Sequence, residues 1–418
     1  MLIEHNIVVI GGGPAGMAAA VAAFDGGEKD VIIIDREDET GGVLRQCIHN
    51  GFGLHKFGCE LTGPEYAEIY RNKISERGIK LYCNTTVVSI DNSKTVVAQN
   101  RDGILKIKAK AIILAMGCRE RSRGALNICG TRPAGIYSAG AAQRLINCYG
   151  LRVGERAVIL GSGDIGLIMA RRLTLQGIKV EAVCEIMPYS GGLVRNITQC
   201  LDDFGIPLYL KTTVSKIHGS KRLEGVTIAQ VDDNNKAITD TERYIPCDTL
   251  LLSVGLIPEN ELSNMAGVEL DALTGGAVVD QNRQTTVDGI FACGNALHVH
   301  DLVDYVSDEA EIAGRNAAQY CLRDGSFSTD AICITKGKNI KYVVPQRVDL
   351  RQKDNLAIYL RVDKPLGRAL FTVKTEKEII AKKLQIRAVP GEMIKIDINK
   401  NQIERVGSNI EISAEALN

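Results

Sequence analysis

The chain has 418 residues, and its 50 basic and 50 acidic residues balance to a net charge of zero. A chain of this length predicts two or three domains, each large enough to bury a core. The balanced charge, without a basic run, argues against nucleic acid or an anionic membrane surface as a main partner.

The twelve cysteines include no Cys-x-x-Cys pair. This argues against a structural zinc, an iron–sulfur cluster and a vicinal redox dithiol, and no metal site is predicted. The N-terminus enters a predicted strand without a charged or cleavable leader, and no apolar run is long enough to cross a bilayer. We therefore expect a cytoplasmic protein with reduced thiols and no membrane span.

The first predicted element, residues 7–10, is a β-branched run typical of a buried parallel strand. A glycine triplet with G-x-G-x-x-G spacing follows it: Gly11, Gly13 and Gly16. Residues 17–24 predict the helix whose N-terminus faces a pyrophosphate. Residues 31–34 predict the next strand, which ends at Asp35, where a carboxylate can accept hydrogen bonds from a ribose. This order predicts a dinucleotide site.

A glycine-pair loop and an irregular glycine-punctuated stretch follow Asp35. A helix is predicted from Thr62 to about residue 78, because Thr62 and Glu65 form a capping box. The strands expected next are residues 80–90, 95–100, 104–110 and 111–115.

Residues 156–185 repeat the opening pattern. A strand over residues 156–160 precedes a helix over 167–175, and a second strand over 180–183 ends near Glu185. The second glycine triplet between strand and helix is Gly161, Gly163 and Gly166, each 150 positions after its counterpart. Two complete fingerprints predict two bound dinucleotides. An acid in each copy favours NAD over NADP, although Arg195 could serve a phosphate.

The remainder of the chain continues as predicted strands and one helix. Strands are expected at residues 208–217, 226–231, 249–254 and 276–280, and a helix from about residue 307 to 321. Beyond about residue 324 an antiparallel pattern takes over, with strands at 356–362, 369–375, 379–386 and 393–398. No cofactor motif is found in this last part.

The order of motifs over roughly the first 325 residues carries a family resemblance. The motifs are the first fingerprint, Ala115-Met116-Gly117, the second fingerprint, Ser253 to Pro258, and Gly289 to Asn295. They resemble the two-dinucleotide-binding flavoproteins of the pyridine nucleotide–disulfide oxidoreductase superfamily. The resemblance implies that the first fingerprint takes FAD, the second takes NAD(P)H, and the last motif returns to FAD. It also implies that the helix after Asp304 points its N-terminus at the flavin.

A narrower resemblance rests on two segments, Gly117 to Arg121 and Ala134 to Gln143. They are similar to the FAD subunits of amine, proline and opine oxidases or dehydrogenases, and to FAD proteins associated with glycerol-3-phosphate dehydrogenase. Three departures stand out: Asn295 replaces the usual Asp, Met116 replaces the usual Thr, and the dithiol motifs are missing.

The predicted cofactor-binding residues combine the fingerprints with the positions that the resemblance implies. They are Gly11, Gly13, Pro14, Ala15, Gly16, Asp35, Arg36, Gly42, Val43, Val88, Ala115, Met116, Gly117, Gly161, Gly163, Asp164, Ile165, Gly166, Glu185, Gly255, Gly294, Asn295, Val306 and Ser307.

Three residues are candidates for proton or thiol chemistry. Cys47 and His49 could form an activated thiol beside the flavin, or could simply pack in a loop. His300 could handle protons, because it should lie near the flavin if the following helix does. The alternative for this region is helix capping, with Asp304 or Ser307 as N-cap. A metal held by His298, His300 and Asp301 would need a third distant ligand.

The predicted fold is α/β, with two Rossmann-like dinucleotide-binding domains and a small, mostly β C-terminal domain. The FAD domain is split into residues 1–118 and 257–325, the NAD(P) domain is inserted at 119–256, and the C-terminal domain covers 326–418.

The expected function is that of an FAD-dependent NAD(P)H oxidoreductase that passes a hydride between NAD(H) and flavin and sends electrons to a second acceptor. The alternative is an FAD subunit of a multi-subunit dehydrogenase acting on glycerol-3-phosphate, proline or a related amine. Expected partners are a small-molecule or protein electron acceptor and a dehydrogenase subunit, and the chain is expected to be oligomeric.

Overall fold

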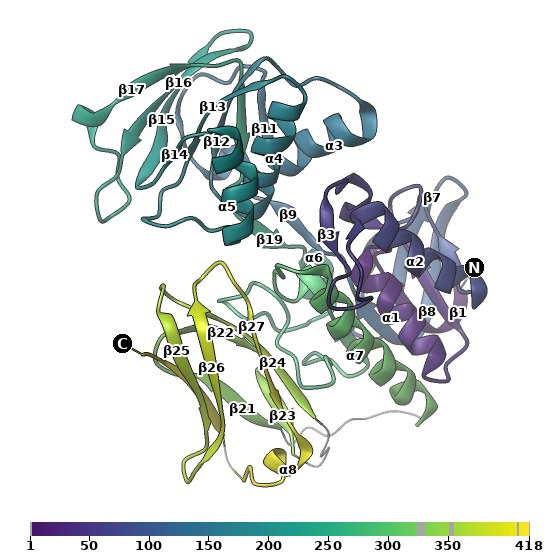
Figure 1. Cartoon of the computed structure of the whole chain (residues 1–418). Coiled ribbons are helices and arrows are strands. Elements are labelled where there is room, and N and C mark those ends of the chain that lie inside the picture. Colours follow the sequence, from purple (N-terminus) through teal and green to yellow (C-terminus); the bar gives the residue numbers. More distant parts are fainter. Residues whose placement is uncertain (1, 324–330, 351–354, 408, 418) are drawn as a thin grey trace. The chain divides into compact units, whose positions relative to one another are not determined.

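The computed structural model describes residues 2–323, 331–350, 355–407 and 409–417 (Figure 1). It divides into two compact units, residues 1–118 with 258–418, and residues 119–257. Each unit is described by itself.

The first unit is built on a sheet with the strand order β5-β2-β1-β8-β7-β6, and β20 pairs with β8. The strands are β1 (Leu2–Ile10), β2 (Val31–Ile34), β5 (Lys80–Tyr82), β6 (Thr86–Ile90), β7 (Thr95–Asn100), β8 (Gly103–Leu114) and β20 (Ile290–Ala292). β1 pairs in parallel with β2 and β8, so the predicted opening strand is confirmed as parallel. The short antiparallel strands β3 (Asn50–Phe52) and β4 (Leu61–Thr62) lie apart from this sheet.

Both faces of the central strands are buried, as a run of branched apolar residues predicts. Ile7 and Val9 pack into one core with three helices, while Val8 and Ile10 pack into a second core on the opposite face. The three helices are α1 (Pro14–Asp25), α2 (Gly63–Glu76) and α7 (Val303–Leu322). The predicted capping box of α2 is confirmed: Thr62 accepts from the amide of Glu65, and the Glu65 side chain accepts from Thr62.

Several predicted boundaries in this unit are wrong. Residues 104–110 and 111–115 form one strand, β8, which is antiparallel to β7 and parallel to β1. The predicted strand 80–90 breaks into β5 and β6 near Asn84, whose φ of 49° is left-handed. Residues 276–280 form no named strand, and only Ala277 bridges to Leu270.

The second unit repeats the α/β arrangement. Its parallel sheet has the order β11-β18-β12-β13-β14, and an antiparallel sheet has the order β10-β15-β16-β17. The strands are β10 (Cys129–Gly130), β11 (Ile136–Ser138), β12 (Arg156–Leu160), β13 (Lys179–Cys184), β14 (Leu208–Tyr209), β15 (Thr212–Gly219), β16 (Leu223–Gln230), β17 (Arg243–Pro246) and β18 (Thr249–Leu252). Its helices are α3 (Ala139–Tyr149), α4 (Asp164–Leu175) and α5 (Val194–Cys200). The predicted strand 208–217 is interrupted at Lys211, whose φ is 47°.

The C-terminal part of the first unit is a β domain of two sheets packed over one apolar core. One sheet has the order β23-β21-β28-β25-β26 and the other β22-β24-β27. The strands are β21 (Ala331–Lys336), β22 (Ile340–Val344), β23 (Arg347–Asp349), β24 (Leu356–Val362), β25 (Gly367–Lys374), β26 (Ile379–Ala388), β27 (Ile394–Ile398) and β28 (Ile410–Ala416). The four strands predicted here correspond to β24–β27, whereas β21, β22, β23 and β28 were not predicted.

The remaining elements are short. They are β9 (Cys118–Glu120), β19 (Leu256–Pro258), α6 (Glu261–Met265), α8 (Lys400–Ile403) and the 3-10 turns η1 (Gly42–Gln46), η2 (Arg123–Ala125), η3 (Asp202–Phe204), η4 (Thr239–Thr241) and η5 (Gly294–Ala296).

Candidate dinucleotide-binding sites and a buried histidine cluster

The first glycine triplet forms a tight turn from β1 into α1. Gly11 has a φ of 103°, and a Cβ added there would lie 2.4 Å from the carbonyl oxygen of Ala115. A Cβ on Gly16 would lie 1.7 Å from the carbonyl oxygen of Gly11. Gly13 differs, because its Cβ would meet no atom closer than the Cα of Gly42, at 4.0 Å. Two glycines therefore close the turn, and the third borders open space where a phosphate could approach the backbone.

The start of α1 is also suited to an anion. Its N-cap residue, Gly13, provides no side-chain hydrogen bond, and Pro14 occupies the first turn. The neighbouring helix α2 has a complete capping box. Because the first amides of a helix have no partner within it, an uncapped N-terminus can accept a phosphate. Helix α4 likewise has no side-chain cap.

Asp35 is held beside the first turn by backbone amides. Its carboxylate accepts hydrogen bonds from Gly12 at 2.5 Å and Glu37 at 2.8 Å. Each carboxylate oxygen has a second lone pair that a ribose hydroxyl could use. Arg36 and Val43 are exposed, and the Cβ of an added side chain on Gly42 would lie 2.9 Å from the Cα of Gly13.

The second fingerprint reproduces this geometry. Added Cβ atoms would lie 2.0 Å from the Ser253 carbonyl oxygen at Gly161 and 2.7 Å from the Gly161 carbonyl oxygen at Gly166. At Gly163 the nearest atom would be the Ser253 Oγ, at 3.6 Å. The second unit thus has the same closed turn with one glycine facing open space.

Glu185 takes the place of Asp35 in the second unit. It accepts hydrogen bonds from the amide and hydroxyl of Ser162 at 2.9 and 2.6 Å, and from the amide of Met187 at 2.9 Å. Asp164 accepts from the Leu193 amide at 2.8 Å and the Asn196 side chain at 2.7 Å, which ties the following loop to the start of α4. Ile165 lies in the first turn of that helix.

The internal repeat extends further than the fingerprints. Thr40-Gly41-Gly42 and Ser190-Gly191-Gly192 are also 150 positions apart. The amide of Gly41 donates to the Gly12 carbonyl at 2.8 Å, and the amide of Gly191 donates to the Ser162 hydroxyl at 3.1 Å. In both units this glycine pair closes back onto the fingerprint, a feature that the sequence carries but that fingerprint matching does not reveal.

The other residues predicted to bind FAD fall into two groups. Ala15, Gly294 and Val306 come together, since an added Cβ on Gly294 would lie 2.7 Å from the Ala15 Cβ and 3.5 Å from the Val306 Cγ1. The second group is Ala115, Met116 and Gly117, the segment that follows β8, of which Ala115 is buried against Gly11. Val88 lies on β6 and is exposed, and Gly255 has a φ of 104° in the second unit.

The predicted capping roles near α7 are wrong. The helix begins at Val303 with Leu302 as N-cap and has no side-chain cap. Asp304 instead accepts hydrogen bonds from the amides of Gly53 and His55, at 3.0 and 2.8 Å. The hydroxyl of Ser307 is buried and hydrogen-bonded to Tyr66 at 2.7 Å.

Cys47 and His49 lie in the loop after η1. The Cys47 thiol is buried and donates to the Val43 carbonyl at 3.2 Å. The His49 Nδ1 lies 3.0 Å from the Asn50 carbonyl oxygen, and its ring packs against Phe52. Asn295 accepts from the amide of His300 at 3.0 Å and donates to the Cys118 sulfur at 3.5 Å.

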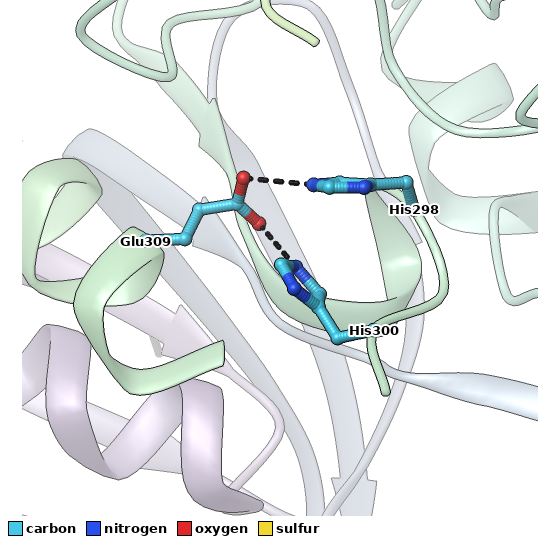
Figure 2. Close-up of side chains that lie close together, drawn as sticks. All are labelled: His298, His300 and Glu309. Atoms are coloured by element: carbon cyan, nitrogen blue, oxygen red, sulfur yellow. Dashed lines mark hydrogen bonds and ion pairs between the residues drawn. The ribbon is translucent and has the colours of Figure 1, made fainter. Parts of the chain in front are cut away.

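A buried cluster of charged and imidazole groups surrounds Glu309 (Figure 2). The Nε2 atoms of His298 and His300 lie 3.0 Å from separate oxygens of the Glu309 carboxylate. The Nε of Arg283 and the amide of Gly294 donate to the same two oxygens, each at 3.1 Å. Glu309 is 0% exposed and Arg283 is 1% exposed. The carboxylate is therefore fully surrounded by hydrogen-bond donors.

Burial determines the charge state of this cluster. Burial lowers the pKa of His298 to about 4, so its imidazole is neutral at pH 7. Burial alone would raise the pKa of Glu309, but the neighbouring imidazoles hold it well below its usual range. Glu309 is then an anion compensated by Arg283, and neutral His298 donates its Nε2 proton to it.

The same three side chains could match a metal ion in number, since one ligand atom from each lies within 4.8 Å of the others. Glu309 already accepts four hydrogen bonds, and the Arg283 guanidinium would repel a cation. The geometry favours a hydrogen-bonded ion pair. Glu309 and Arg283 were not predicted, because a lone acid within a helix and an arginine in a loop carry no local signal.

The C-terminal domain contributes to this region. Tyr359 on β24 packs against both imidazoles, with ring centroids 5.7 Å apart in each case. Arg361 forms an ion pair with Asp301 and donates to the Val299 carbonyl at 3.2 Å. The domain thus holds the loop that carries His298 and His300.

Comparison with known proteins gives a consistent result. The family model for pyridine nucleotide-disulphide oxidoreductases matches residues 5–320. An opine oxidase component from Agrobacterium tumefaciens (strain Ach5), named as one of that enzyme's subunits, is 26% identical over 343 residues, covering 77% of this chain and 66% of that protein. Hydrogen cyanide synthase subunit HcnB of Pseudomonas protegens is 26% identical over 283 residues, covering 63% and 59%. The chain therefore spans somewhat less than two thirds of the length of these relatives.

The fold is similar to that of thioredoxin reductase from T. acidophilum, with a TM-score of 0.63 and 23% identity over 76% of this chain and 98% of that one. Among the described residues, no helix is long and apolar enough to cross a membrane.

Proposed function

The chain belongs to the pyridine nucleotide-disulphide oxidoreductase family, and from this premise we propose that it is the FAD-binding subunit of a multi-subunit oxidoreductase. The observation that carries the proposal is the alignment of most of the chain with relatives that are themselves named as subunits, one of opine oxidase and one of hydrogen cyanide synthase. Family membership supports an oxidoreductase, and the partner and substrate are parts of the proposal.

The first unit fits FAD. Gly13 leaves the approach to its backbone open, α1 offers uncapped amides to the pyrophosphate, and Asp35 has lone pairs for a ribose. Gly294 and Asn295 lie beside the first turn of α1 and would border the rest of the cofactor. FAD bound there would supply reversible two-electron chemistry.

The second fingerprint fits an adenine dinucleotide. Glu185 is fixed by Ser162 and Met187 in the arrangement that Asp35 has in the first unit. A carboxylate at this position accepts from the two ribose hydroxyls and would repel a 2′-phosphate. We propose NAD(H) rather than NADP(H) as its ligand.

The sequence itself offers no dithiol to receive electrons, because no Cys-x-x-Cys occurs among its twelve cysteines. Electrons must then pass between this chain and another molecule. In the proposal a partner subunit oxidises glycerol-3-phosphate, proline or a related amine, and this chain takes up the electrons.

A second candidate function is direct oxidation of NADH by this chain, with electrons passed to an unidentified acceptor. The intact second fingerprint favours it. In either function His300, Cys47 and His49 are proposed to assist proton transfer, His300 because its loop follows Asn295.

The test compares the isolated FAD-loaded chain with the complex purified from the native host, both under argon. We expect one substrate of the proposed classes to bleach the flavin absorbance of the complex and none to bleach that of the isolated chain. Rapid bleaching of the isolated chain by NADH, with no substrate acting on the complex, would instead support the second candidate.

A further inference from the structure

The free edge of β26 in the C-terminal domain presents an apolar surface outside the region that matches the family. β26 ends its five-stranded sheet and pairs only with β25 among the described strands. Ile386 is 85% exposed and Leu384 is 47% exposed. Exposed apolar residues on an unpaired strand edge are unusual, because such an edge can recruit another strand.

One half of this edge is covered by side chains near α8. Gln402 donates to the Ile380 carbonyl at 3.1 Å, and Arg405 donates to the Ile379 carbonyl at 3.5 Å. Within the described parts of the chain, residues 384–387 form hydrogen bonds only with β25. The uncovered half of the edge therefore coincides with the exposed apolar residues.

The charge of β26 indicates what can pair with it. The strand carries three basic residues, Lys382, Lys383 and Arg387, and no acidic residue. Antiparallel pairing with a second copy, in the register that places Leu384 opposite Ile386, would also place Lys383 opposite Arg387. Like charges directly opposite each other destabilise a strand pair. The edge is better suited to a different polypeptide that offers acidic residues.

We propose that residues 384–387 of β26 pair with an extended segment of the partner subunit that carries apolar and acidic side chains. This inference rests on the proposed function and names the surface that would join the two subunits. Main-chain hydrogen bonds would provide the pairing, and the apolar side chains opposite Leu384 and Ile386 would provide specificity.

The test uses the tagged full-length chain purified from the native host, as wild type and as the variants Ile386→Glu and Ile104→Glu. Ile104 is a matched control, because it is an isoleucine on β8 with 68% exposure. We expect the wild type and Ile104→Glu to retain a stoichiometric second polypeptide. Ile386→Glu should weaken its binding at least about tenfold while keeping the wild-type thermal unfolding midpoint.

Each other outcome is decisive. A second polypeptide that binds all three proteins equally overturns the β26 inference and leaves the proposed function standing. A wild-type chain that carries no second polypeptide overturns both. A wild-type homodimer that Ile386→Glu dissociates, measured by light scattering, assigns the edge to a second copy and also overturns the inference.

Discussion

The carboxylate of Glu309 accepts a hydrogen bond from the backbone amide of Gly294 at 3.1 Å. Gly294 also lies against the first turn of α1, since a Cβ added to it would lie 2.7 Å from that of Ala15. The histidine cluster and the first dinucleotide turn therefore share one residue, and a change in the cluster should affect the turn.

Replacing Glu309 with Gln should destabilise the chain strongly. The change leaves the guanidinium of Arg283 buried without its counter-charge, which typically costs about 3–5 kcal/mol. Glu311 on the same helix pairs with Lys56 at a more exposed site, so Glu311→Gln should cost no more than about 1 kcal/mol. Urea unfolding at pH 7 measures both, and equal effects would contradict the buried ion pair.

Acidification should weaken the fold through the same cluster. The pKa of His298 is about 4 in the folded chain and about 6.5 when unfolded, so the unfolded state binds the extra proton between these values. The contribution of His298, roughly 3 kcal/mol, is present above pH 6.5 and is lost as the pH falls toward 4. In His298→Gln this part of the pH dependence of the free energy of unfolding should disappear, and an unchanged profile would count against it.

Gly13→Ala should separate cofactor binding from folding. The φ of Gly13 is −73°, which alanine adopts readily, and the added methyl group would enter the open space beside the turn. We expect the flavin-free variant to keep its stability within about 0.5 kcal/mol and its FAD dissociation constant to rise at least about tenfold.

Gly163→Ala is the matched control for that experiment, because it makes the same change in the second unit. It should retain FAD and bind NADH more weakly. Loss of FAD from Gly163→Ala, rather than from Gly13→Ala, would reverse the assignment of the two sites.

Glu185→Gln should raise the dissociation constant for NADH about tenfold, because hydrogen bonds to a charged group are worth about 1.5–3 kcal/mol. Glu181→Gln on the same strand removes ion pairs with Arg156 and Lys179 and should leave NADH binding unchanged. Fluorescence titration with NADH measures both variants. Equal affinities for all three proteins would show that Glu185 does not contact the ribose.

Much of the α/β fold could be predicted because its signals are local. The branched run before Gly11 predicted β1, and the capping box at Thr62 predicted the start of α2. The breaks at Asn84 and Lys211 were missed, because a left-handed residue other than glycine has no clear sequence signal. The true start of α7 was missed because Leu302 is not a typical N-cap residue.

The histidine cluster depends on contacts between distant parts of the chain. Arg283, His298 and Glu309 meet only after β20 and α7 have packed, and Tyr359 arrives from the C-terminal domain. The sequence placed His298 and His300 together but offered no reason to connect them with Glu309. Local patterns predicted the glycine turns and could not predict this buried charge network.

Native mass spectrometry of the tagged chain, purified under mild conditions from its host, tests the central proposal most directly. We predict a hetero-oligomer in which each copy of this chain carries one FAD and is joined to a different polypeptide. A flavin-loaded monomer or homo-oligomer without a second polypeptide would contradict the proposal that this chain is one subunit of a larger oxidoreductase.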